Sequence, residues 1–282
     1  IQLHDAYLSV MEALKHGGIA NRTKVSIKWV DSEFLTPEIL NDTFAGVDGI
    51  IIPGGFGSRG TEGMILAANY ARENKIPFLG ICLGMQMAMV AFARNVLGYE
   101  DANSSELNPD TTHPVVDLMP DQNGIENLGG TLRLGSYPCV LDKKSKAYAL
   151  YGTQLINERH RHRFEINNHY RYDFTSHGMM ISGQSPDGHI VEMIELPDHP
   201  FYVGIQAHPE LKSRPNHAHP LFAGFVESAE EQGVLRRAKK LLMKRNHLSE
   251  PEAHRYLQKT SMDTGRTMTE SAHMVTMLIQ ED

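Results

Sequence analysis

The chain has 282 residues and a formal net charge of −7, a length that allows one large domain or one medium domain with an appendage. Its two cysteines, Cys82 and Cys139, exclude a disulfide framework. Because the sequence has no leader-like segment and no apolar run of about 18 residues, we expect a soluble cytoplasmic protein with no membrane partner.

The charge is unevenly distributed along the chain. From residue 234 onward there are nine Lys or Arg and six Asp or Glu, a net of +3, which leaves a net of −10 on the preceding part. An acidic body with a basic tail suggests two units with different partners, although charge alone favours a solvated helix face as the explanation of the basic run.

The first half of the chain alternates between helix-like and strand-like segments. Apolar residues at helical spacing between Tyr7 and Leu14 predict an opening helix that ends at His16-Gly17-Gly18. Alternating residues predict a strand over 25–29, and an all-apolar run over 49–52 is typical of a strand buried on both faces. We then expect a helix over 62–74, a strand over 77–81 and a helix over 84–95.

This order predicts an α/β fold with a doubly wound, mostly parallel sheet flanked by helices, and functional residues at the carboxyl ends of the strands. Residues 103–142 are rich in Pro, Asn, Asp and Gly and predict loops and short strands. Further strands are expected over 178–182, 189–195 and 201–205. After residue 225, three short amphipathic segments with two capping boxes predict a small three-helix bundle.

Cys82 is the candidate nucleophile. In Gly80-Ile81-Cys82-Leu83-Gly84 it stands where an apolar strand gives way to a helix. A sharp turn of this kind strains the residue at its apex, flanking glycines avoid clashes, and the helix N-terminus favours the thiolate. The alternative is a buried cysteine that only fills space.

His208 and Glu210 are the candidate base and the residue that orients it. They follow the apolar run 201–205 and lie two residues apart across a proline, so the carboxylate can fix the tautomer of the imidazole. The alternative is a histidine at the end of a strand, bonded to the backbone.

The glycine-rich stretch 53–60 follows a predicted strand and precedes a helix. It lacks the Lys-Ser/Thr of a phosphate-binding loop, which argues against nucleotide binding. Its backbone amides are candidates for one wall of an oxyanion hole, with the amide of Leu83 as the other, and a plain tight turn is the alternative.

Five motifs, in this order, resemble the glutamine amidotransferase domain of CTP synthases over about residues 1–228. They are Pro-Gly-Gly-Phe-Gly-Ser-Arg-Gly-Thr-Glu-Gly, Gly-Ile-Cys-Leu-Gly-Met-Gln, Asp-Ala-Asn-Ser-Ser-Glu, Gly-Gly-Thr-Leu-Arg-Leu-Gly and Glu-Arg-His-Arg-His-Arg-Phe-Glu-Ile-Asn. The resemblance implies hydrolysis of L-glutamine to glutamate and ammonia through a thioester at Cys82, with His208 as base and Glu210 as its orienting residue.

The resemblance also implies the roles of the substrate-binding residues. Gly54 and Leu83 match the oxyanion positions of the family, and the glutamine-binding positions correspond to Gly55, Gln86, Glu106 and Arg163. An acid for the ammonium of the substrate and a guanidinium for its carboxylate are chemically reasonable. Without the resemblance, Glu106 and Arg163 would be interpreted as surface charges, and residues 159–163 as a solvated basic strand.

The glutaminase step implies no cofactor and no metal. The ATP, UTP and Mg²⁺ of the family belong to an amidoligase domain that this sequence does not contain, so this chain should not make CTP by itself. The family also has a strand just before the opening helix, which would precede Ile1.

The region from about 234 to 280 resembles the ANTAR domain, a three-helix RNA-binding module, through Ala-Lys, Ser-Glu-x-Glu-Ala and Met-Asp signatures. We therefore divide the chain into residues 1–228 and 229–282. The resemblance implies that basic residues contact the phosphates of hairpin RNA, namely Arg237, Lys239, Lys240, Lys244 and Arg245. A helical appendage that packs or oligomerises is the alternative.

Two other functions remain open at this point. In one, the chain is a glutamine-sensing, RNA-binding antitermination regulator whose amidotransferase part is not primarily catalytic. In the other, the same nucleophile hydrolyses a different γ-glutamyl amide.

Overall fold

The computed structural model describes residues 4–118 and 133–280. The chain divides into two units, Ile1–Val226 and Glu227–Asp282. Helix α7 (Pro220–Asn246) begins in the first unit and continues in the second. In the part of the chain described, no helix has the length and apolar character needed to cross a bilayer.

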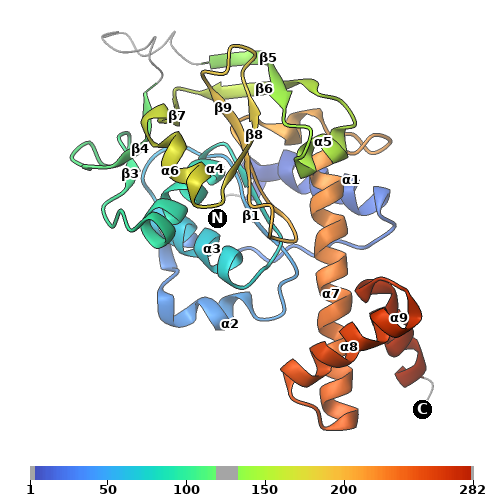
Figure 1. Cartoon of the computed structure of the whole chain (residues 1–282). Helices are drawn as coiled ribbons and strands as arrows, with labels where there is room; N and C mark the ends of the chain where they lie inside the picture. The colour runs from blue at the N-terminus through green and yellow to red at the C-terminus, as the bar shows by residue number, and fades with distance from the viewer. Residues whose placement is uncertain (1–3, 119–132, 281–282) are drawn as a thin grey trace. The chain divides into compact units, whose positions relative to one another are not determined.

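The first unit is built on a seven-stranded sheet with the order β1-β2-β10-β9-β8-β5-β6 (Figure 1). The pairs β1/β2 and β2/β10 are parallel, and the pairs from β10 to β6 are antiparallel. The strands are β1 (Ile50–Ile52), β2 (Phe78–Ile81), β10 (Tyr202–Ile205), β9 (Val191–Glu195), β8 (Met180–Gln184), β5 (Arg133–Leu141) and β6 (Leu155–His162). Within this sheet, parallel pairing is confined to the three short apolar strands that the sequence marks as buried.

Helices cover both faces of this sheet, which confirms the doubly wound class, but the sheet is mixed and not mostly parallel, since only two of its six described strand pairs are parallel. Alternate residues of β2 point to opposite sides: Phe78 belongs to one hydrophobic cluster, whereas Leu79 and Ile81 belong to the other. The first cluster takes its helical residues mainly from α3 (Thr61–Glu73) and α4 (Leu83–Phe92). The second takes them from α1 (Leu8–Ala20) and the start of α7.

The smaller elements complete the first unit. A second sheet has the order β3-β4-β7, with β3 (Asn103–Ser104), β4 (Pro114–Leu118) and β7 (Phe164–Ile166). Three short helices are α2 (Leu40–Phe44), α5 (Lys146–Tyr151) and α6 (Arg171–Ser176), and a π-helical turn over Ala93–Leu97 extends α4.

Two details of the N-terminal prediction are wrong. Residues 25–29 are not a strand: partly buried Val25 and Ile27 pack against the second cluster, but the segment joins neither sheet. The alternation of apolar and polar residues therefore reflects one side of the segment packing on the core, and not hydrogen bonding to a neighbouring strand. Helix α1 also continues through Gly17 and Gly18. A Cβ on Gly17 would lie 2.7 Å from the Phe222 carbonyl oxygen, so this glycine permits close packing and does not end the helix.

The second unit contains the remainder of α7, α8 (Glu250–Thr264) and α9 (Met268–Gln280) around a small apolar core. A full capping box joins Ser249 and Glu252 at the start of α8, and Thr267 and Glu270 bond reciprocally at the start of α9. The predicted three-helix arrangement is observed, except that its first helix is the end of a 27-residue one.

Candidate active site

Cys82 stands on a strained elbow between β2 and α4. Its backbone has φ 51° and ψ −104°, and its amide donates to the Ile205 carbonyl oxygen at 2.7 Å. A Cβ on Gly84 would lie 2.0 Å from the Ile52 carbonyl oxygen, and one on Gly80 would lie 2.8 Å from the backbone of Gly84. Both glycines are therefore required by close backbone contacts, and the turn places the thiol at the N-terminus of α4.

His208 and Glu210 lie just beyond the end of β10. His208 Nδ1 and Glu210 Oε1 are 2.8 Å apart, and the His208 amide donates to the Arg159 carbonyl oxygen. Burial disfavours the imidazolium, but interactions with the Cys82 sulfur and the Glu210 carboxylate outweigh it and raise the pKa of His208 to about 10. At neutral pH the ring is therefore cationic, and it lies between the Glu210 carboxylate and the Cys82 sulfur.

The glycine-rich loop after β1 closes over this pair. A Cβ on Gly54 would lie 2.7 Å from His208 Cε1 and 3.5 Å from Cys82 Cβ, so the loop, the imidazole and the elbow meet at one point. A Cβ on Gly55 would lie 3.4 Å from Leu83 Cδ2. Gly54 thus lies next to Cys82, and Gly55 lies next to the side chain of Leu83.

Glu106 and Arg163 approach each other although 57 positions separate them in the sequence. Partial burial raises the pKa of Glu106, and the positive charge of Arg163 opposes that rise. Within the described residues, Arg163 Nε is buried without a hydrogen-bond partner. Gln86 is also buried, and its Nε2 donates to the Phe164 carbonyl oxygen at 2.9 Å. Two of the expected binding residues thus flank the β6–β7 junction.

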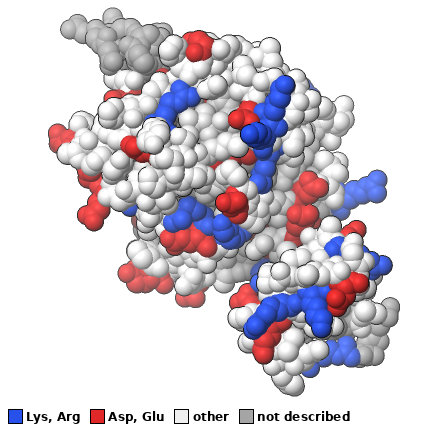
Figure 2. Space-filling model, in the orientation of Figure 1, with Lys and Arg blue, Asp and Glu red and all other residues white. Residues whose placement is uncertain are grey.

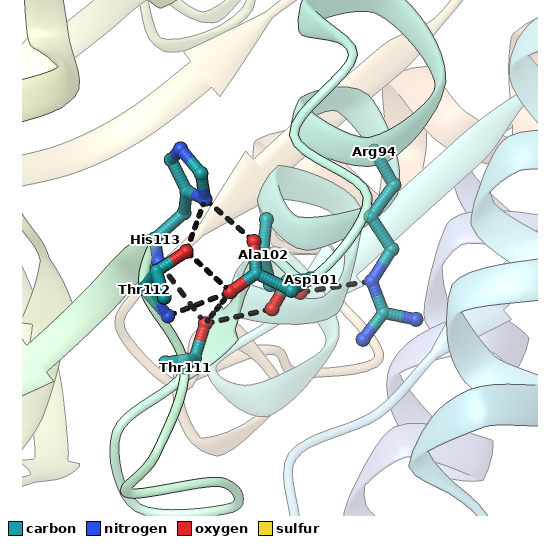
Figure 3. Close-up of polar contacts among 6 residues, drawn as sticks. All are labelled: Arg94, Asp101, Ala102, Thr111, Thr112 and His113. Atoms are coloured by element: carbon teal, nitrogen blue, oxygen red, sulfur yellow. Dashed lines mark hydrogen bonds and ion pairs between the residues drawn. The ribbon is translucent and has the colours of Figure 1, made fainter.

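Asp101 fixes the segment that carries Glu106 (Figure 3). Its carboxylate accepts from Thr112 N at 2.6 Å and from Thr112 Oγ1 at 2.7 Å, and it pairs with His113 Nδ1 at 2.5 Å. These hydrogen bonds hold the pKa of Asp101 well below its usual range. Arg94 donates to the Ala102 carbonyl oxygen at 2.8 Å, which ties the base of the loop to the end of α4.

A buried polar cluster next to the site was missed by the sequence analysis. His160 Nδ1 and His162 Nε2 are 3.1 Å apart, and Glu192 lies 2.6 Å from Arg133 and 3.5 Å from His160. Burial and the charge of Arg133 lower the pKa of His160 to about 2 and that of His162 to about 3. The sequence contains a signal for this cluster, because arginines and histidines alternate in β6 and every second side chain of the strand is buried.

An imidazole, a carboxylate behind it and a glycine-rich loop therefore surround Cys82 in the arrangement expected for thiol chemistry on an amide. No group of three or more His, Cys, Asp or Glu that could hold a metal ion occurs among the residues the structure describes. The model of the family "Glutamine amidotransferase class-I" matches residues 2–228. The chain belongs to the class-I glutamine amidotransferase family. Its first unit is accordingly an enzyme domain of the amidotransferase type.

The amidotransferase unit is similar in sequence to CTP synthases. The CTP synthase of Clostridium beijerinckii is 59% identical over 232 residues, 82% of this chain and 43% of that protein. That of Carboxydothermus hydrogenoformans is 58% identical over 226 residues, 80% of this chain and 42% of that protein. The chain thus spans less than half the length of these curated relatives.

Solved structures agree on the fold of the amidotransferase unit. The Trypanosoma brucei CTPS glutaminase domain with bound acivicin superposes with a TM-score of 0.76 at 36% identity, covering 80% of this chain and 89% of that one. A putative GMP synthase protein from Thermoplasma acidophilum, 16% identical with a TM-score of 0.50, covers 78% of this chain and 88% of that one, and shares the fold alone.

The tail of this amidotransferase carries a second match, to the ANTAR domain, over residues 225–275. The five basic residues expected to bind RNA all lie on α7. Arg237 pairs with Glu230 at 3.0 Å, and Lys239 pairs with Glu250 at 2.7 Å. Lys240, Lys244 and Arg245 are exposed. Figure 2 shows Lys and Arg side chains across one face of this region, with acidic side chains beside them.

Proposed function

We propose that the first unit hydrolyses L-glutamine to glutamate and ammonia. The observation that carries the proposal is the meeting of Cys82, His208 and Gly54 at the elbow, with Glu210 behind the imidazole. A thiol next to a cationic imidazole at a helix N-terminus is an activated nucleophile.

The chemistry follows from the positions of these groups. The Cys82 thiolate, paired with the His208 imidazolium, attacks the side-chain amide carbon of glutamine, and the backbone amides of Gly54 and Leu83 donate to the developing oxyanion. The imidazolium of His208 donates its proton to the departing nitrogen, so that ammonia leaves and a γ-glutamyl thioester remains. Neutral His208 then takes a proton from water, which attacks the thioester and releases glutamate and the Cys82 thiol.

Glu106 and Arg163 supply complementary charges for a zwitterionic substrate. The carboxylate of Glu106 suits the α-ammonium group, and the guanidinium of Arg163 suits the α-carboxylate. Their proximity, and the unpaired buried Nε of Arg163, support this assignment. Gly55 and Gln86 complete the proposed glutamine site.

The similarity to CTP synthases supports a destination for the ammonia. We propose that it passes to an amidoligase domain that converts UTP to CTP with ATP and Mg²⁺. Ammonia release should therefore be measured from the intact chain with and without a supplied CTP synthase amidoligase domain. Release abolished in Cys82→Ala supports the proposal. A folded wild-type chain that releases no ammonia under either condition contradicts it.

A second function is proposed for the tail, binding of hairpin RNA, because the ANTAR match covers it. Lys240 and Lys244 are exposed and lie four residues apart on one side of α7. Charge reversal at both should weaken hairpin binding and reduce its dependence on salt. The same reversal at exposed Lys143 and Lys144 of the first unit is the matched control.

The regulatory alternative predicts that glutamine or a covalent adduct on Cys82 changes the affinity for RNA. An affinity that is the same with and without either would leave the tail as an RNA-binding module that does not sense glutamine. Hairpin binding that is equal in both charge-reversal variants would contradict a role for this face of α7.

A further inference from the structure

Gln206 makes a contact with Cys82 that the mechanism above does not use. Its side chain is fully buried, and its Nε2 lies 3.6 Å from the Cys82 sulfur. The backbone N–H of Gln206 donates to the Glu192 carbonyl oxygen at 2.8 Å. The backbone that carries this side chain is therefore fixed between β9 and the turn that leads to His208.

The orientation of the Gln206 amide is determined by its neighbours. The Phe164 carbonyl oxygen can only accept, so buried Gln86 must turn its NH₂ group toward it. The same Gln86 nitrogen lies 3.2 Å from Gln206 Oε1, which must therefore be the acceptor. This leaves the Gln206 NH₂ group facing the sulfur. A backbone carbonyl thus fixes, through two amides, a donor aimed at the nucleophile.

We propose that Gln206 is a further catalytic residue, an N–H donor that stabilises the Cys82 thiolate and holds its sulfur in line for attack. The inference rests on the proposed glutaminase function only for the identity of the substrate. A hydrogen bond to an anion is stronger than one to a neutral acceptor, so the donor favours the thiolate over the thiol. A fixed amide also adds no charge, so it does not compete with the Glu210 carboxylate for His208.

The test measures the thiolate directly and needs no turnover of glutamine. The rate of alkylation of Cys82 by chloroacetamide is followed against pH in the intact chain, with Cys139 replaced by Ala to leave a single thiol. Gln206→Met keeps the size of the side chain and removes the donor. We expect the midpoint of the alkylation profile to move up by about one pH unit, since one charge-assisted hydrogen bond is lost.

Two further variants separate this role from packing. Gln206→Glu has the same shape but places an acceptor against the sulfur, so its midpoint should move up by more than that of Gln206→Met. Gln86→Leu releases the amide of Gln206 without removing it, and its midpoint should move up by less. The matched control is Gln184→Met on β8, where the lost side chain accepts from Arg171 and not near Cys82; its midpoint should not move.

The outcomes are decisive in either direction. A profile of folded Gln206→Met that superposes on that of the parent overturns the proposal, as does a Gln206→Glu midpoint at or below the parental one. If Gln206→Met does not fold, the Gln206→Glu result alone decides. A shifted midpoint in a chain that hydrolyses no glutamine would keep the inference and reject the proposed function, so the two can fail separately.

Discussion

At position 54 the active site has room only for glycine, whose side chain is a single hydrogen. Its φ is outside the left-handed region, so alanine introduces no backbone strain there. The added methyl would lie 2.7 Å from His208 Cε1, however, and the buried ring would have to move away from Cys82. We expect Gly54→Ala to lower kcat by at least about tenfold, because small displacements of a catalytic group are costly.

The measurement is steady-state glutamine hydrolysis together with thermal unfolding. A nearly unchanged unfolding temperature with a reduced kcat would locate the effect in the site. A kcat equal to that of the parent would mean that the imidazole is not held where the loop places it.

Glu210 sets the pH range over which His208 stays protonated. The pKa of His208 is raised to about 10, so its imidazolium is present at neutral pH and is lost as the pH rises through that value. Glu210→Gln removes one of the two interactions that raise it, and the pKa should fall by roughly one to two units. The decline of kcat at alkaline pH should then begin at a correspondingly lower pH.

A kcat profile from pH 7 to 10.5 tests this, with the exposed Glu100→Gln as the matched control. An alkaline limb at the same pH in Glu210→Gln and parent would show that Glu210 does not act through His208.

These residue-scale roles differ in how far the sequence reveals them. The glycines around Cys82 and the short His208-Pro209-Glu210 turn are local patterns with a local physical cause, so they could be predicted. Gln206 could not, because its orientation depends on a carbonyl of β7 and an amide of α4. His160 and His162 could be predicted in part. Their alternation with arginines along the strand is visible in the sequence, but their partner Glu192 is not.

At the scale of elements, the loop closed by Asp101 determines where Glu106 stands. The hydrogen bonds of Asp101 join its two ends, and the Asn103 amide donates to the His113 carbonyl oxygen at 3.2 Å. Asp101→Ala should release the loop without touching Cys82. We expect the KM for glutamine to rise roughly fivefold while kcat changes by less than about twofold, because uniform binding is lost.

The control is Asp110→Ala, an exposed acidic residue in the same loop. Equal KM values for Asp101→Ala and the parent would contradict the view that this cluster positions Glu106. A large fall in kcat instead would mean that the loop also supports the nucleophile.

The elements themselves were predicted unevenly. The buried strands β1, β2 and β10 and helices α3 and α4 have strong local signals. The nine-residue β5 begins at Arg133, within a stretch expected to form loops and short strands. It could not be predicted from its own composition because its stability comes from pairing with β6 and β8. Residues 119–132 of that stretch lie outside the described part of the chain.

At the scale of the whole molecule, the buried histidines make the folded chain sensitive to acid. The pKa of His162 is lowered to about 3 by burial and by Arg133, while an unfolded histidine titrates near 6.5. The folded state therefore binds fewer protons than the unfolded state between these values. The stability that His162 contributes is complete above pH 6.5 and is lost as the pH falls toward 3.

Each such histidine should remove about 2 kcal/mol from the free energy of unfolding between pH 7 and pH 5. Denaturant titrations of the intact chain at the two pH values measure this loss. In His162→Gln, which keeps a donor for the Phe164 carbonyl oxygen, the loss should be about 2 kcal/mol smaller than in the parent. The exposed His169→Gln should lose as much as the parent. Equal losses in His162→Gln and the parent would mean that this histidine is already protonated in the fold, which would place a positive charge beside Arg133 and require Glu192 to be ionised.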